Sequence, residues 1–467
     1  MKKSRRNDIT RRTVLKGVGS VLAAPILAGA APVRSAASGH ISHVPEELAR
    51  AVRAAWAEFE KRADPADVAA AWRVFATAHQ SLRELVHSAR PVRAASGEIT
   101  HFYSPGDLRY GDVALMLHVL TGVELELGPV EEGFTIVTGI GTIIGFGKYM
   151  TLDPGWLTMV ITWLKYYGDV YERPKMVTRI PIADDVSLGL VGDWGTGFYR
   201  NAPNVAPAEN VAGLLAQLMP DYSFHLGDVY YTGLPEDNLT QFPPTEGKHF
   251  LDIWPRARLS TFALNSNHDM YPGAYGFFGE ALASPKFEAQ QQSSIIWLEN
   301  THWIILGLDS AYSASWVGLY GEGHLEQFQL DLITQAASTG KRILLMCHHN
   351  GLEEVGTTKR HLWNQIVKAL DGAEAWWYWG HAHLGTVYTK TDGIYPRCSG
   401  HGGIACGRAE DVLNSSAVEW CEEKNAGDPD IAVRVMNGLT HITLNGRTIT
   451  EVFFDEKGTP GWDLTTR

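Results

Sequence analysis

Side chains able to bind metal ions follow several short apolar runs of this chain. The run Tyr222–Leu226 leads into Gly227 and Asp228, and later runs lead into an amide and several imidazoles. The full set is Asp193, Asp228, Asn267, His268, His348, His381 and His383. Carboxylate, amide and imidazole groups suit hard and borderline metal ions. In an open α/β sheet, ligands bind at the carboxyl ends of the strands. The pattern therefore predicts a two-metal site at that edge.

Two metal ions about 3.5–4 Å apart can hold a phosphate group and activate a water between them. One carboxylate must bridge the two ions, and Asp228 is the candidate. The other predicted ligands are Asp193 and His383 for the first ion, and Asn267, His348 and His381 for the second. One residue separates His381 from His383, so their rings can face different ions.

Five motifs in this order resemble the calcineurin-like metallophosphoesterase superfamily. They are Asp193-x-Gly195, Gly227-Asp228-x-x-Tyr231, Asn267-His268, the apolar run into His348, and Gly380-His381-x-His383. The first two motifs are similar to those of the purple acid phosphatase branch. The resemblance covers residues 186–455 and implies an α/β fold, a layered α-β-β-α sandwich.

The resemblance also implies roles for the matching residues. Asp193, Asp228, Tyr231 and His383 would hold the first ion, with Tyr231 as a phenolate that favours ferric iron. Asp228, Asn267, His348 and His381 would hold the second ion, which would be zinc, manganese or ferrous iron. His268 would donate a hydrogen bond to the phosphate or protonate the leaving alkoxide. Asp269 would orient His268.

Two positions leave the family pattern or allow a second choice. Ser266 stands where the family has glycine, and this predicts either an ordinary φ at that position or a slightly shifted loop. His348 is followed by His349, and we take His348 as the ligand with His349 as the alternative.

The elements that must position these residues alternate between strands and helices. Strands are predicted at 186–191, 222–226, 259–264, 295–298, 303–308, 342–346 and 375–379. Helices are predicted at 204–219, 325–337 and 362–370, and Asn445-Gly446 predicts a hairpin that joins 441–444 to 448–454. This alternation predicts a layered α/β sandwich in a metallophosphoesterase domain at 183–467.

The N-terminus has the pattern of an export signal. Arg11 and Arg12 precede an apolar stretch that ends in the small-residue pattern of Ala28 to Ala30. Residues 1–30 are therefore predicted to be a twin-arginine signal peptide, with an uncleaved membrane anchor as the alternative. Residues 31–44 are predicted to be a linker. The expected location is periplasmic or extracellular.

Residues 45–182 form an N-terminal region to which the sequence assigns no role. Leu48, Val52, Trp56 and Phe59 recur at helical spacing, and a second helix is predicted to begin at Asp64-Pro65. The apolar runs 134–146 and 156–167 are shorter than the roughly 20 residues of a membrane-spanning helix. Packing against the main domain is the favoured interpretation of 134–167, and peripheral membrane contact is the alternative.

Composition limits the class of partner. The 467 residues have a net charge of -12, and loss of residues 1–30, with seven Lys/Arg and one Asp, leaves about -18. An acidic surface repels polyanions, so we do not expect a nucleic-acid polymer as a partner. The expected substrate is a small phosphate ester. Four cysteines are too few for a disulfide scaffold, although a disulfide between Cys398 and Cys406 stays open. The sequence does not determine the oligomeric state.

These observations predict a hydrolase that cleaves phosphate esters by in-line attack of metal-bound hydroxide, most simply a phosphatase. No motif contains a nucleophilic serine or cysteine, so a phosphoenzyme is not required. A phosphodiesterase acting on nucleotide or lipid diesters would use the same residues. A non-catalytic exported protein that binds metal or phosphate is an alternative of another class.

Overall fold

The computed structural model describes residues 46–88, 92–93, 99–100, 111–122, 135–138, 141–146, 150–152, 157–195, 206–229, 232–233, 247–404, 406–428 and 434–464. The predicted signal peptide, the predicted linker and the predicted ligand Tyr231 lie outside these residues. None of the described helices has both the length and the apolar character needed to cross a membrane.

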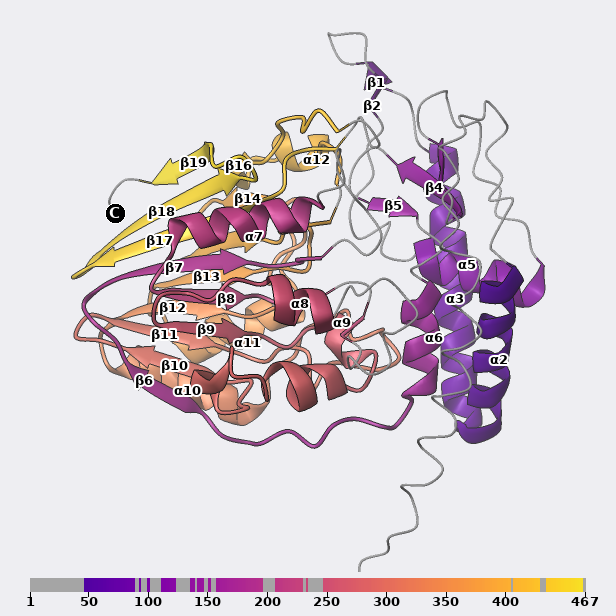
Figure 1. The fold of residues 1–467 in the computed structure, drawn as a ribbon, viewed down its shortest axis with the longest axis horizontal. Coiled ribbons are helices and arrows are strands. Elements are labelled where there is room, and N and C mark those ends of the chain that lie inside the picture. The colour runs from indigo at the N-terminus through magenta and orange to yellow at the C-terminus, as the bar shows by residue number, and fades with distance from the viewer. Residues whose placement is uncertain are drawn as a thin grey trace, which may run out of the picture.

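The larger of the two main sheets has eight strands in the spatial order β16-β14-β15-β13-β12-β11-β10-β6 (Figure 1). Its strands are β6 (Thr178–Pro181), β10 (Ile296–Glu299), β11 (Trp303–Gly307), β12 (Arg342–Met346), β13 (Ala375–Trp379), β14 (Gly385–Tyr388), β15 (Ile394–Ser399) and β16 (Val418–Cys421). The run β11, β12, β13 and β15 is parallel. The loops that follow β12 and β13 therefore lie beside each other at one edge.

The second main sheet has six strands in the order β19-β18-β17-β7-β8-β9. They are β7 (Asp185–Val191), β8 (Tyr222–His225), β9 (Ser260–Ala263), β17 (Gly438–Asn445), β18 (Thr448–Asp455) and β19 (Pro460–Leu464). Strands β7, β8 and β9 are parallel. The loops after these three strands also share one edge.

The two sheets pack face to face with helices on their outer sides. Leu188, Phe224 and Phe262 of one sheet share an apolar core with Leu344 and Trp376 of the other.

On the outer faces, a Cβ at Gly189 would meet the Leu215 side chain of α7, and Trp363 of α11 stacks on Trp377. The predicted α-β-β-α sandwich is confirmed.

The helices of the sandwich connect these strands. They are α7 (Pro207–Leu218), α8 (Gly247–Ile253), α9 (Asn267–Met270), η3 (Phe277–Ala281), η4 (Glu288–Gln290), α10 (Gln327–Ser338), α11 (His361–Leu370) and α12 (Glu410–Leu413).

The N-terminal region forms a helical layer beside the α9 end of the sandwich (Figure 1). Its helices are α2 (Glu46–Arg62), α3 (Pro65–Ser88), α5 (Gly111–Thr121) and α6 (Leu157–Lys165). It also contains the short pair β1 (Val92–Arg93) and β2 (Ile99–Thr100), and the antiparallel sheet β3 (Thr135–Thr138), β4 (Gly141–Phe146) and β5 (Met150–Leu152). The glycine-rich run 134–146 thus supplies two strands.

Helix α6 packs into the protein rather than standing apart from it. Trp163 and Leu164 are fully buried, and the core that contains them continues into the sandwich. Strand β6, within the region predicted as N-terminal, pairs with β10 in the eight-stranded sheet. Membrane contact by the rest of 134–167 stays a prediction.

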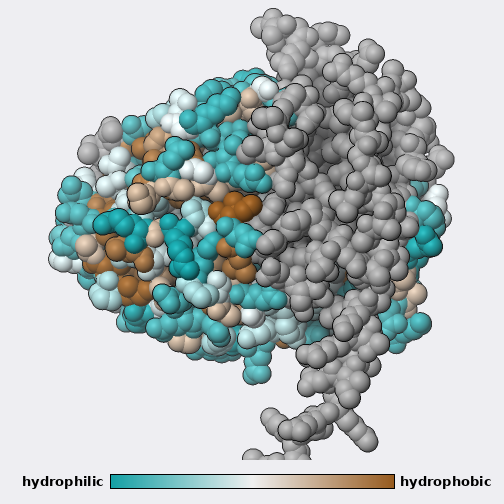
Figure 2. Space-filling view, viewed as in Figure 1, coloured by the Kyte–Doolittle hydropathy of each residue, from teal (hydrophilic) through white to brown (hydrophobic). Residues whose placement is uncertain are grey.

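The described surface carries few large apolar side chains. The exposed ones are Val170, Met176, Met219 and Leu259. On the described part of the face in Figure 2, hydrophilic residues predominate and hydrophobic ones form small separate patches.

Cys347, Cys398, Cys406 and Cys421 are buried free thiols, so Cys398 and Cys406 form no disulfide in this structure. Burial raises the pKa of Cys347 and of Cys421 to about 12, which keeps both thiols protonated.

Candidate metal centre

The predicted ligands meet where the carboxyl ends of both sheets come together. Asp193 and Asp228 follow β7 and β8, and Asn267 begins α9 after β9. His348 follows β12, and His381 and His383 follow β13. Each sheet therefore contributes three of the six described ligand candidates.

Four of these residues have a strained backbone. Asp193, Asp228, His381 and His383 have φ of 55°, 63°, 65° and 53°. A non-glycine residue in this region costs on the order of 1–3 kcal/mol and persists only where its surroundings fix it. Backbone strain at four residues whose side chains converge is typical of a functional site.

Glycines allow the carboxylates and imidazoles to approach so closely. A Cβ at Gly227, where φ is 100°, would lie 2.6 Å from Nδ1 of His348. A Cβ at Gly380 or Gly400 would lie 2.5 Å or 2.6 Å from Oδ2 of Asp193. A side chain at any of the three would displace a predicted ligand.

Three polar atoms converge at the predicted second subsite. Nε2 of His348 lies 2.8 Å from Oδ1 of Asn267 and 3.1 Å from Nδ1 of His381. Nδ1 of His381 lies 3.2 Å from the same Asn267 oxygen. Nδ2 of Asn267 donates to the hydroxyl of Tyr271 at 3.0 Å, and the amide oxygen lies on the side of the two imidazoles.

The hydrogen bonds of His348 show that its inward nitrogen carries a lone pair. Nδ1 lies 2.9 Å from the carbonyl oxygen of Leu226, which can only accept, so Nδ1 carries the hydrogen. Burial lowers the pKa of His348, so its neutral form is favoured and Nε2 is unprotonated. This lone pair faces the Asn267 oxygen and, at 3.3 Å, Oδ1 of Asp228. Several electron-rich atoms thus point at one another, an arrangement that a cation would stabilise.

Asp228 lies near residues of both predicted subsites. Its Oδ1 is near His348, and its Oδ2 lies 3.7 Å from Nε2 of His268. On the other side, Nε2 of His383 lies 3.5 Å from Oδ1 of Asp193. Ligand atoms of Asp193, Asp228 and His348 all lie within 4.8 Å of one another.

The carboxylate of Asp228 is held in its charged form. Burial acts to raise its pKa, but the attraction of a protonated His268 imidazole outweighs this and lowers the pKa below its usual range. Asp193 accepts hydrogen bonds from the backbone N–H of His381 at 2.7 Å and 3.0 Å. Both carboxylates are thus prepared to bind a cation.

His349 also lies close enough to be considered a ligand, because one group of neighbouring ligand atoms is His348, His349 and His381. Its Nε2 lies 2.7 Å from the carbonyl oxygen of Tyr320, and its Nδ1 lies 2.8 Å from the Ser310 hydroxyl. Both ring nitrogens are therefore used within the protein. This favours His348 as the ligand and gives His349 a supporting position.

His268 lies beside Asp228, and its backbone N–H donates to that carboxylate at 3.3 Å. Its role as an acid stays a prediction.

Asp269 accepts hydrogen bonds from the backbone and hydroxyl of Ser266 in a capping box at the start of α9, so it helps to fix this turn. Its predicted effect on the His268 ring stays a prediction. Ser266 has an ordinary φ of -134°, as its identity predicted.

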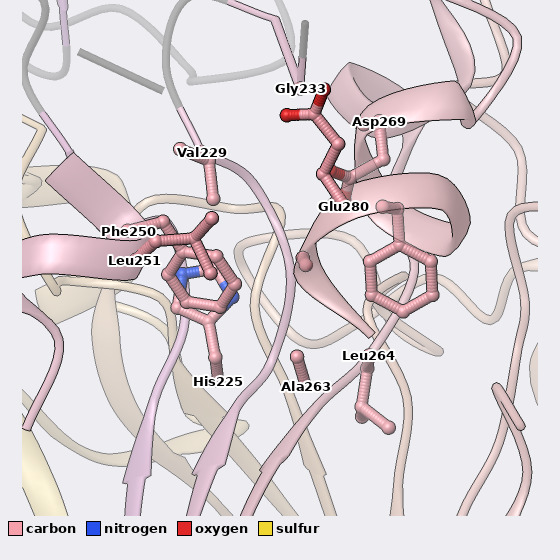
Figure 3. Close-up of a pocket in the computed structure, with 12 residues that line it drawn as sticks. His225, Val229, Gly233, Phe250, Leu251, Ala263, Leu264, Asp269 and Glu280 are labelled. Carbon is pink, nitrogen blue, oxygen red and sulfur yellow. The ribbon is translucent and has the colours of Figure 1, made fainter. Parts of the chain in front are cut away.

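A small recess lies behind the turn that carries Asp228. His225 and Phe250 lie on one side of it, and Asp269 and Glu280 on the other (Figure 3). Burial lowers the pKa of His225 to about 3 and raises that of Asp269 to about 8, so both groups favour their neutral forms at neutral pH. The recess is thus walled largely by apolar and uncharged groups.

The structure therefore brings together Asp193, Asp228, Asn267, His268, His348, His381 and His383. The residues that sequence reasoning missed are Tyr271, Ser310 and Tyr320, which hold Asn267 and His349. No sequence motif marks them. Tyr320 acts through a backbone carbonyl 29 residues away, and Ser310 lies 39 residues from His349. Tyr271 lies only four residues from Asn267, so its helical spacing was the one available signal.

Comparisons with known proteins give a fold likeness alone. No family model and no curated protein matches the chain. One similar solved structure is "GAP50 the anchor in the inner membrane complex of Plasmodium", with 13% identity, a TM-score of 0.42, and coverage of 61% of this chain and 89% of that one. A dimetal phosphatase from Danio rerio has 11% identity, a TM-score of 0.37, and coverage of 60% and 98%. PhoD has 11% identity, a TM-score of 0.38, and coverage of 73% and 76%. These values are too low to assign a function, which has to come from the site.

Proposed function

We propose that this protein is a dinuclear-metal hydrolase of phosphate esters, a phosphatase of the metallophosphoesterase superfamily. The observation that carries the proposal is the convergence of His348 Nε2 with the oxygens of Asn267 and Asp228, at 2.8 Å and 3.3 Å. The donors are carboxylate, amide and imidazole groups, which fit zinc, manganese or iron. Asp193, Asp228 and His383 would hold the first ion, and Asp228, Asn267, His348 and His381 the second.

When bound, two ions would lower the pKa of a water and stabilise negative charge on the phosphate oxygens. The protein's own residues supply the remainder. Asp228 separates the subsites, and the hydrogen bond to Leu226 orients His348. His268, beside Asp228, can donate a proton to the departing alkoxide.

The test is hydrolysis of a chromogenic phosphomonoester beside the matching diester, with metal analysis and Asp228→Asn as control. Faster monoester cleavage that the variant loses supports a phosphatase. Faster diester cleavage would replace that assignment with a phosphodiesterase. A chain that binds metal and cleaves neither would overturn the proposed reaction in favour of a binding protein.

We also propose that the first subsite is like that of purple acid phosphatases and that the protein is exported. A Tyr231 phenolate on ferric iron would give a visible charge-transfer band, which Tyr231→Phe should abolish while iron stays bound. Export through the twin-arginine pathway should stop when Arg11 and Arg12 are both replaced by lysine. A colourless iron-loaded protein, or unchanged export, would refute the respective part.

A further inference from the structure

The loop between β11 and α10 (residues 308–326) surrounds His349. The Ser310 hydroxyl and the Tyr320 carbonyl contact its two ring nitrogens at 2.8 Å and 2.7 Å. Gly323 comes so near that a Cβ there would lie 2.5 Å from the His349 Cβ. This loop, called the β11–α10 loop below, therefore determines where the His349 ring lies.

His349 in turn supports two of the predicted ligands. Its ring centroid lies 4.7 Å from that of His381 and 5.0 Å from that of His348. All three rings are buried. Because close-packed buried groups have little room to adjust, a shift of His349 would move its neighbours.

The same loop reaches the third ligand of the second subsite by another route. The ring of Tyr320 lies 6.3 Å from that of Tyr271. Tyr271 accepts the hydrogen bond that fixes the Asn267 amide. Each non-bridging ligand of the second subsite thus contacts a residue that the loop holds. Asp193 of the first subsite contacts the His381 backbone N–H and Gly400, so the loop reaches it only indirectly, through the main chain of His381.

The outer side of the loop is held by the N-terminal helices. Trp316 stacks on Trp163 of α6 with centroids 4.2 Å apart and planes 18° apart. Nε1 of Trp163 donates to the Trp316 carbonyl at 3.1 Å. Phe59 of α2 and Tyr167 lie 5.5 Å and 4.8 Å from the same indole. The middle of the loop is therefore packed against α2 and α6.

One arginine of the N-terminal region ties the two ends of the loop together. Arg173, only 5% exposed, donates to Asp309 at 2.9 Å and also to Glu326. Its guanidinium lies 4.2 Å from the ring centroid of Tyr312 in the loop. Leu319 and Tyr320 have φ of 55° and 52°, a strained conformation that needs such support.

We propose that the N-terminal helices position the second metal subsite through the β11–α10 loop, with Trp316 and Arg173 as the positioning residues. This inference rests on the proposed function, because it concerns the ions of that site. It gives the N-terminal region a function in metal binding, beyond its packing against the sandwich.

The test compares metal binding by the full chain and by Trp316→Leu. Loss of a residue that orients ligands typically lowers metal affinity about 10–100-fold. Trp316→Leu should therefore lose one of two ions on dialysis and bind added Mn²⁺ about 10–100-fold more weakly at that subsite, while Trp316→Phe stays near wild type. Combination with His348→Ala should cause no further loss, because that subsite is already absent.

Trp420→Leu is the matched control, since Trp420 is also half-buried and packs on Phe453. It should lower thermal stability without changing the metal content. Ser310→Ala, which removes only the hydroxyl bonded to His349, provides the test if Trp316→Leu does not fold, and should also weaken Mn²⁺ binding. A folded Trp316→Leu with two ions and unchanged affinity would overturn this inference alone. A wild-type chain that binds no metal would overturn the proposed function as well.

Discussion

Nε2 of His348 lies 2.8 Å from Oδ1 of Asn267, inside the predicted second subsite. The Leu226 carbonyl accepts the hydrogen of His348 Nδ1, and the amide nitrogen of Asn267 donates to Tyr271 on the far side. A lone pair of each side chain therefore faces the same point, where a bound cation would be attracted to both.

Replacement of His348 should remove one ion. We expect His348→Ala to reduce the metal content from two ions per chain to one and to abolish ester hydrolysis, as measured by elemental analysis and by the phosphomonoester assay. His349→Ala should instead weaken binding about 10–100-fold, as loss of a supporting residue does. Equal metal loss in both variants would assign His349 as a ligand too.

Replacement of His268 should slow turnover without loss of metal. A general acid contributes about 10²–10⁴-fold to the rate, so kcat of His268→Ala should fall by that factor for an alkyl phosphate. The loss should be smaller for an aryl phosphate, whose leaving group needs no proton. If the two substrates lose the same factor, His268 is not the acid.

Gly400→Ala should disturb the first subsite. A Cβ there would lie 2.6 Å from Oδ2 of Asp193 and 3.1 Å from the His383 backbone nitrogen, so the carboxylate has to move. We expect weaker binding of the first ion and a large loss of activity. The control is Gly213→Ala in α7, where a Cβ would meet no atom within 4 Å. This substitution should stabilise the helix by about 0.5–1 kcal/mol.

His401 should make the protein sensitive to acid. Burial lowers its pKa from 6.5 to about 3, and among the described residues neither ring nitrogen has a hydrogen-bond partner. Between these pH values the unfolded chain binds a proton that the folded chain does not. Stability is therefore present above pH 6.5 and falls as the pH decreases toward 3, by up to about 1.4 kcal/mol per pH unit.

Urea unfolding of wild type and His401→Leu at pH 7.5, 5.5 and 4.5 measures this effect. The variant lacks the titrating group, so its free energy of unfolding should fall less with acid than that of wild type. A difference between the two proteins that does not change with pH would contradict the prediction.

Sequence patterns were sufficient for the strands that carry the site. Arg342–Met346 and Ala375–Trp379 are strands with the predicted bounds, because both are short apolar runs with every side chain buried or nearly so. Strands β6 and β19 were not predicted, since each contains proline and lies at a sheet edge. The strands β14, β15 and β16 and the short strands β1 to β5 were also missed, although β15 lies inside its sheet.

The ligand set could be predicted because its members directly follow the ends of five strands, with His381 and His383 after the same one, whereas the residues that support the ligands could not. Asp269 bonds to Ser266 in the capping box that satisfies the first turn of α9, a contact that no metal-site motif marks. Tyr320 contacts His349 from 29 residues away through a carbonyl that any residue could supply.

The division of ligands between the two sheets has a consequence for assembly. Asp193, Asp228 and Asn267 come from one sheet, and His348, His381 and His383 from the other, so bound ions would staple the sheets together at one edge. Neither sheet alone supplies all the ligands, so the complete ligand set exists only when the two sheets are packed together. Ions at 100 times their Kd would then add about 2.7 kcal/mol per subsite against unfolding. A chain that keeps two bound ions through dialysis would therefore be one in which both sheets are folded and packed.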